Sequence, residues 1–144
     1  MRKFVFLCLT LMFASLGHAA ELATVKDAWV RLPPPGANIA AAYLTLETKQ
    51  PLTLSGAQSP AAETVELHSM TMKNGIMEMR YLPTLALEPG KPVKLEPGGL
   101  HLMLINLKKP LKAGDSVQLV LNFKQGQRRV GAMHVRAVVK AAAN

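Results

Sequence analysis

The sequence contains almost no cysteine. Its single cysteine, Cys8, lies in an apolar stretch near the N-terminus. If that stretch is removed during export, the mature chain has no disulfide and no thiolate. Cysteine nucleophiles, zinc–thiolate sites and blue-copper centres, which need a cysteine ligand, are then excluded.

The N-terminal stretch has the pattern of a secretory signal peptide. Two basic residues are followed by an apolar run, Phe4 to Phe13, and then by the small residues of a cleavage site that ends at Ala19. The run is too short to cross a bilayer core of about 30 Å as a helix. Cys8 lacks the small residues that precede a lipoprotein cleavage site. We therefore expect a cleaved leader, residues 1–19, and one exported domain, residues 20–144.

The mature chain is also poor in acidic and aromatic residues. It keeps 15 basic and nine acidic residues, a formal charge of +6, and aromatic residues make up 5% of the whole sequence. The charge suits an acidic protein partner or an anionic membrane surface. Scattered basic residues, few aromatics and an exported location argue against nucleic acid. No second long apolar run is present in the sequence, so we expect no transmembrane segment in the mature protein.

Short segments of β-type residues alternate with turn signals along the mature chain. We expect strands at residues 25–32, 40–48, 51–54, 64–72, 76–82, 93–95, 100–107, 116–123 and 130–139, with a loop flanked by Gly56 and Pro60. No segment shows a convincing 3.6-residue period. The pattern predicts a single all-β domain, an antiparallel β-sandwich or barrel with Greek-key connections.

Asn74-Gly75 is the strongest hairpin signal in the chain. With these two residues as the loop, the facing pairs are Met72 with Met77, Met70 with Met79, and His68 with Tyr81. Because side chains alternate along a strand, all six share one face of the hairpin. His68 and Met79 become diagonal neighbours, about 7–8 Å apart at the backbone. Long side chains can bring their donor atoms together across that gap.

A second histidine and methionine pair follows Gly98-Gly99. His101 and Met103 are two residues apart, so on a strand they point to the same face. If this strand lies beside the hairpin, the two segments together supply two imidazoles and two thioethers.

These donors select a soft, monovalent metal. Thioethers favour Cu(I), whereas calcium and magnesium prefer oxygen ligands. Two neutral imidazoles and two thioethers carry no negative charge, which suits Cu(I) better than Zn²⁺ or Cu²⁺. Thioethers also avoid the disulfide formation that affects thiols in an oxidising compartment.

Each of these residues also has a simpler interpretation. Methionine is a flexible core filler, so Met70, Met72 and Met77 are interpreted as core or pocket-lining residues, with Met70 the strongest reserve ligand. His134 is interpreted as structural or surface-exposed, and Tyr81 as packing beside the site.

The spacing of the four donors resembles that of a known family. Ten residues separate His68 from Met79, and 21 separate Met79 from His101-x-Met103. This is similar to the H-x10-M-x21-H-x-M signature of the PCu(A)C periplasmic copper chaperones. Further matching segments are Ala28-Trp29-Val30-Arg31, Ala41-Ala42-Tyr43, Val65-Glu66-Leu67-His68, Pro97 to Leu104, Leu111 to Asp115 and Val117 to Phe123. The resemblance covers nearly all of the mature chain.

The resemblance implies a cupredoxin-like β-fold that binds Cu(I) through His68, Met79, His101 and Met103. It also implies delivery of copper to the CuA site in the copper-receiving subunit of cytochrome c oxidase, sometimes alongside thioredoxin-like Sco assembly proteins. Some family members have a His- and Met-rich C-terminal tail that handles Cu(II). This chain ends Val138-Val139-Lys140-Ala141-Ala142-Ala143-Asn144, so we do not expect that second site.

Three other functions compete with a copper chaperone. A periplasmic copper storage or tolerance protein would use the same site, and the sequence does not separate the two. An enzyme is disfavoured, because no nucleophile or general base stands out near the four donors. A purely structural interaction domain with a methionine-rich core would bind no metal at all.

Overall fold

The computed structural model describes residues 21–141, so the predicted leader lies outside the described part. Within this part of the chain there are ten strands: β1 Thr24–Arg31, β2 Ile39–Glu47, β3 Leu52–Gln58, β4 Ala62–Lys73, β5 Ile76–Tyr81, β6 Leu85–Leu87, β7 Val93–Leu95, β8 His101–Leu107, β9 Ser116–Gln125 and β10 Arg128–Lys140. No helix occurs within residues 21–141. Accordingly, this part of the chain has no helical segment with the length and apolarity needed to cross a membrane.

Seven of the strands form a closed barrel. Their order is β4, β8, β2, β1, β10, β9 and β3. Pairing between Ala57 on β3 and Val65 on β4 closes the ring. β1 and β10 run parallel, whereas the other paired strands are antiparallel. β8 lies between β4 and β2 in the barrel, so strands that are adjacent in space are not consecutive in the sequence. The prediction of an all-β antiparallel fold with Greek-key connections is confirmed, in its barrel form.

The barrel interior is filled by alternate residues of the strands. On β9 the buried side chains are Val117, Leu119, Leu121 and Phe123. Burying a side chain of this size stabilises the fold by about 1.5–3 kcal/mol each. The same alternation on β4 and β8 buries Leu67, Leu102 and Leu104. The residues between them, including His68 and His101, therefore belong to the outer face of the barrel wall.

Two features of the fold differ from the sequence prediction. The loop predicted between Gly56 and Pro60 begins later than expected, because β3 continues through Gly56 to Gln58 with a register shift between Leu54 and Gly56. Glycine at a bulge lets the strand stay paired with β9 despite the irregularity. β6, Leu85–Leu87, was not predicted, although β7, Val93–Leu95, which is equally short, was.

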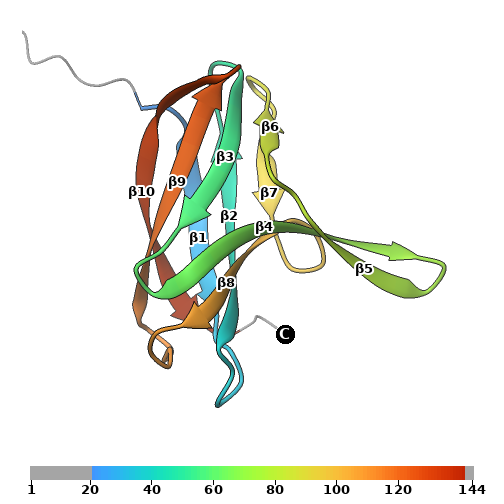
Figure 1. Cartoon of the computed structure of the whole chain (residues 1–144), viewed down its shortest axis with the longest axis vertical. Helices are drawn as coiled ribbons and strands as arrows, with labels where there is room; N and C mark the ends of the chain where they lie inside the picture. The colour runs from blue at the N-terminus through green and yellow to red at the C-terminus, as the bar shows by residue number, and fades with distance from the viewer. Residues whose placement is uncertain (1–20, 142–144) are drawn as a thin grey trace, which may run out of the picture.

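The β4–β5 hairpin extends outward from the barrel wall (Figure 1). Asn74 and Gly75 have φ angles of 51° and 75°, the left-handed values that a type I′ turn requires at both positions. The predicted register is confirmed, with His68 paired to Tyr81, Met70 to Met79 and Met72 to Met77.

Candidate metal centre

β4 and β8 place the two histidines opposite each other. His68 pairs with His101 in the antiparallel register. Their ring centroids lie 5.8 Å apart at an interplanar angle of 55°. His101 is only 4% exposed although it is on the outer face. The condition stated from the sequence, that the His101 strand lies beside the hairpin, is therefore met. The two imidazoles lie on adjacent strands and face one another.

Glu66 determines which nitrogen of His68 is free. Its carboxylate oxygen Oε2 lies 2.8 Å from His68 Nε2. An ionised carboxylate only accepts hydrogen bonds, so Nε2 carries the proton and Nδ1 keeps its lone pair. His68 Nδ1 is buried, and no described residue gives it a hydrogen-bond partner. Buried polar atoms are normally paired, so an unpaired imidazole nitrogen here fits a metal ligand.

His101 is oriented by the backbone. Its Nδ1 lies 3.1 Å from the carbonyl oxygen of Gly99. A carbonyl only accepts, so Nδ1 donates and Nε2 is left with the lone pair. The same Gly99 oxygen accepts a hydrogen bond from the Met70 N–H at 3.1 Å. One carbonyl thus fixes the His101 ring and also joins the turn before β8 to β4.

The thioethers lie on either side of the two histidines. Met79 opposes Met70, two residues beyond His68 toward the hairpin tip. Met103 opposes Glu66, two residues from His68 in the other direction. Both are thus diagonal neighbours of His68, about 7–8 Å away at the backbone. Met70 lies on the same face, so the register alone does not choose between Met70 and Met79.

Some of the simpler interpretations are wrong. Met72 and Met77 are 68% and 58% exposed, so they are not core residues. They lie where the hairpin extends past the strands that could cover it. His134 on β10 is exposed, which confirms the surface interpretation. The ring of Tyr81 contacts His68 edge-on at a centroid distance of 6.2 Å, although the side chain is largely exposed.

The chain matches a family model over residues 23–138, and that family is described as "Putative lipoprotein LpqE-like". The protein Lxx21020 of Leifsonia xyli subsp. xyli, named a "Putative lipoprotein", is 32% identical over 123 residues, which cover 83% of this chain and 73% of the relative. This chain belongs to the LpqE-like family of PCuAC-type domains.

Solved structures agree with this family. The copper-bound PCuAC domain from PmoF2 has a TM-score of 0.68 at 23% identity, covering 87% of this chain and 97% of that domain. The solution structure of CuI-DR1885 from Deinococcus radiodurans has a TM-score of 0.64 at 32% identity, covering 86% of this chain and 81% of that one. The predicted cupredoxin-like fold is confirmed.

The candidate donors of this LpqE-like chain are soft and uncharged. Within residues 21–141, no group of three or more His, Cys, Asp or Glu side chains is arranged to hold a metal ion. The strand register places two imidazoles and the thioethers of Met70, Met79 and Met103 on one face of β4, β5 and β8. Such donors match a soft ion of low charge.

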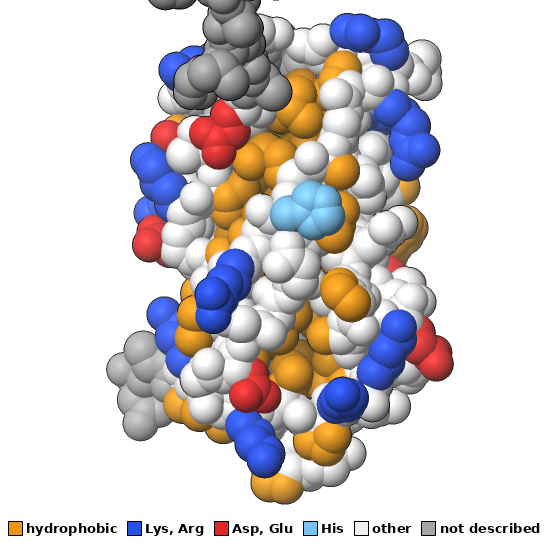
Figure 2. Space-filling model, turned by 90° about the vertical axis from the view of Figure 1, so that its left-hand side faces the viewer, with side chains coloured by type: hydrophobic (Ala, Val, Ile, Leu, Met, Phe, Trp, Pro, Cys, Tyr) orange, Lys and Arg blue, Asp and Glu red, His pale blue; other side chains and the backbone are white. Residues whose placement is uncertain are grey.

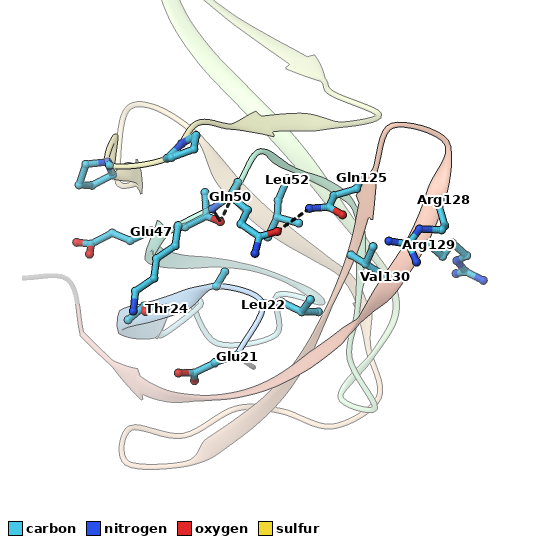
Figure 3. A pocket seen from close by; sticks show the side chains of 16 residues that line it. Glu21, Leu22, Thr24, Glu47, Gln50, Leu52, Gln125, Arg128, Arg129 and Val130 are labelled. Atoms are coloured by element: carbon cyan, nitrogen blue, oxygen red, sulfur yellow. Dashed lines mark hydrogen bonds between the residues drawn. The ribbon is translucent and has the colours of Figure 1, made fainter. Parts of the chain in front are cut away.

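A hollow of the LpqE-like domain lies away from the candidate centre. It lies at the end of the barrel between the start of β1, the end of β2, the β6–β7 connection and the β9–β10 turn (Figure 3). Gln50 and Gln125 hydrogen bond across it at 3.1 Å. None of the imidazole or thioether donors lines it. The candidate centre lies on the barrel wall, outside this hollow.

Sequence reasoning overlooked Glu66. The residue lies two positions before His68 and so shares its face, which is the signal that could have identified it. Outer-shell carboxylates of this kind fix the tautomer and orientation of metal-binding histidines.

Proposed function

We propose that this protein is an exported copper carrier that binds one Cu(I) ion through His68, Met79, His101 and Met103. The observation that carries the proposal is the buried, unpartnered Nδ1 of His68 beside the His101 ring. The copper-bound domain of PmoF2 and the CuI form of DR1885 support it by similarity of fold. The four-ligand assignment rests on the geometry of this site and on the family spacing.

In this proposal the protein holds and releases its cargo without chemical turnover. His68 and His101 present lone pairs whose directions are fixed by Glu66 and by the Gly99 carbonyl. Met79 is 46% exposed, so it is the ligand that an incoming acceptor reaches first. Replacement of the Met79 thioether by an acceptor ligand starts the transfer, and the copper stays Cu(I) throughout.

The acceptor that we propose is the copper-receiving subunit of cytochrome c oxidase, at its CuA site, with a Sco-type thioredoxin-like protein as a further partner. Support comes from the family resemblance and from the formal charge of +6 on the mature chain, which suits an acidic partner. On the face opposite the hairpin, basic and acidic side chains are intermingled (Figure 2). Because the exposed Met79 lies on the hairpin, we place acceptor docking on that side.

We propose a periplasmic location. The predicted leader, residues 1–19, supports export, and so do the lipoprotein descriptions of the family and of Lxx21020. Those descriptions do not extend to a lipid on Cys8, because Phe6 and Leu7 precede it instead of small residues.

Native mass spectrometry of residues 20–144 with Cu(I) under reducing conditions tests the proposal. We expect one tightly held ion in the wild type, and loss of that ion in His68→Ala and His101→Ala. His134→Ala is the matched control, because His134 is exposed on β10, a strand outside the site. Equal binding by all three variants would refute the site.

A deletion strain separates delivery from storage. A chaperone for the oxidase predicts lower oxidase activity under copper limitation. A storage or tolerance protein that uses the same site predicts lower survival in excess copper instead.

A further inference from the structure

One face of the projecting hairpin consists of methionines. Met72 opposes Met77, and Met70 opposes Met79 in the next facing pair toward His68. The other face of the hairpin is mostly polar and includes Thr71, Lys73, Glu78 and Arg80, with Ile76 as its apolar member. Glu78 and Arg80 form an ion pair there at 3.3 Å. Thioethers are therefore sorted to the face that also carries the candidate metal centre.

Packing does not explain the two methionines nearest the turn. Met72 and Met77 are both mostly exposed and lie outside the hydrophobic core cluster. Solvated strand positions normally carry polar side chains. Two directly opposed, exposed thioethers at the tip of a hairpin therefore call for a role other than filling space.

The spacing of the pairs suits a metal ion. Side chains that are directly opposed on antiparallel strands have Cβ atoms about 4.5–5.5 Å apart. Two flexible thioether arms can meet on one ion across that gap. Each facing pair lies two residues, about 6.6 Å, from the next. The series Met72/Met77, Met70/Met79 and His68 thus forms a continuous row from the hairpin tip to the partly buried His68 imidazole.

We propose that Met72 and Met77 form a second, weaker Cu(I) site at the hairpin tip, from which the ion passes through the Met70/Met79 pair to the tight site. The identity of the ion rests on the proposed function. Two neutral thioethers select a soft monovalent ion, and two donors hold it less tightly than four. Each step is a ligand exchange in which one Cu–S bond breaks as a bond forms to the next thioether sulfur or, at the tight site, to an imidazole nitrogen. The ion remains Cu(I) and no proton moves.

The test compares the wild type with the double variant Met72→Leu/Met77→Leu, and with Met133→Leu as a control that removes a thioether from β10. Cu(I) is supplied anaerobically as its acetonitrile complex, and bound ions are counted by native mass spectrometry. Methyl resonances of ¹³C-labelled methionine report which thioethers contact the ion. Circular dichroism checks the fold of each variant.

We expect the wild type and Met133→Leu to bind one tight and one weaker ion, with the methyl signals of Met72 and Met77 shifting on the second addition. We expect the double variant to bind only the first ion and to load it at least threefold more slowly. His101→Ala should lose the tight ion and keep the weaker one.

The outcomes separate the two proposals. One tight ion in the wild type, with unmoved Met72 and Met77 signals and an unchanged double variant, overturns the second site and leaves the carrier function intact. Absence of the tight ion from the wild type overturns the carrier function. An unchanged ion count in the double variant together with weaker binding to an acceptor protein would make the tip a protein-docking surface and would also overturn the second site.

Discussion

Replacing Glu66 with glutamine tests whether this carboxylate orients the metal-binding face of His68. The carboxylate lies 2.8 Å from His68 Nε2, and the two side chains are 36% and 13% exposed. Glutamine keeps the length of the side chain and can still accept through its amide oxygen. It loses the charge, and charge-assisted hydrogen bonds are roughly twice as strong as neutral ones.

The expected magnitude follows from the geometry. Loss of an outer-shell partner typically costs about 10–100-fold in metal affinity. Because Glu66 is partly exposed and solvent screens its charge, we expect the affinity loss for Glu66→Gln to lie at the lower end of this range. We expect about a tenfold loss of Cu(I) affinity, which corresponds to ~1.4 kcal/mol. Glu66→Ala removes the acceptor altogether, and we expect a loss closer to the upper end of the range.

The assay is competition with a chromogenic Cu(I) chelator at neutral pH. Glu78→Gln is the matched control, because it removes the same charge from the opposite face of the same hairpin. We expect less than a twofold change in this control. ¹⁵N chemical shifts of the His68 ring in the apoprotein provide an independent measurement, with Nε2 protonated in the wild type and a mixture of tautomers in Glu66→Ala. Equal losses of Cu(I) affinity in Glu66→Gln and Glu78→Gln would show that the net charge of the protein matters and that the orientation of His68 by Glu66 does not.

Three further predictions concern the ligands and the fold. Met79→Leu should weaken Cu(I) binding strongly, and Met70→Leu less, while circular dichroism shows both folded; the reverse order would exchange their roles. Cu(I) affinity should fall as the pH is lowered below neutral, because protons compete with the ion for both imidazoles; a flat profile in the chelator assay would remove both histidines. Burial raises the pKa of the Tyr43 phenol, and the nearby Arg31 opposes this with a smaller effect. The folded state thus holds this proton more tightly, so stability from this group is present below pH about 10 and is lost as the pH rises further. Tyr43→Phe should flatten that alkaline loss in thermal unfolding; an unchanged slope would contradict it.

The hairpin and its register were predictable because both are local. Asn74-Gly75 fixes the turn, and the turn fixes every facing pair up to His68 and Tyr81. The period of two then assigns all six side chains to one face. No information from distant parts of the chain was needed.

The pairing of β4 with β8 joins segments that are distant in the sequence. The local sequence therefore could not predict that these two strands are adjacent. The spacing of His101 and Met103 shows that they share a face, but not which strand lies beside them. The exposure of Met72 and Met77 was missed for a related reason. How far a hairpin extends past its neighbouring strands depends on the whole barrel, and a local pattern of apolar residues reads the same in either case.

The barrel wall joins the first described strand to the last. β1 pairs with β10 in parallel, with Trp29 beside Val138. This contact spans nearly the whole described chain, so the ring cannot close until β10 is available. Non-local pairing of this kind slows folding, because the entropy of closing a long loop is lost before the contacts form. During export, a chain that emerges N-terminus first would keep an open barrel until its final strand has crossed the membrane. The same arrangement makes the C-terminal strand the part whose truncation would be least tolerated, because its loss would expose the edges of β1 and β9 together.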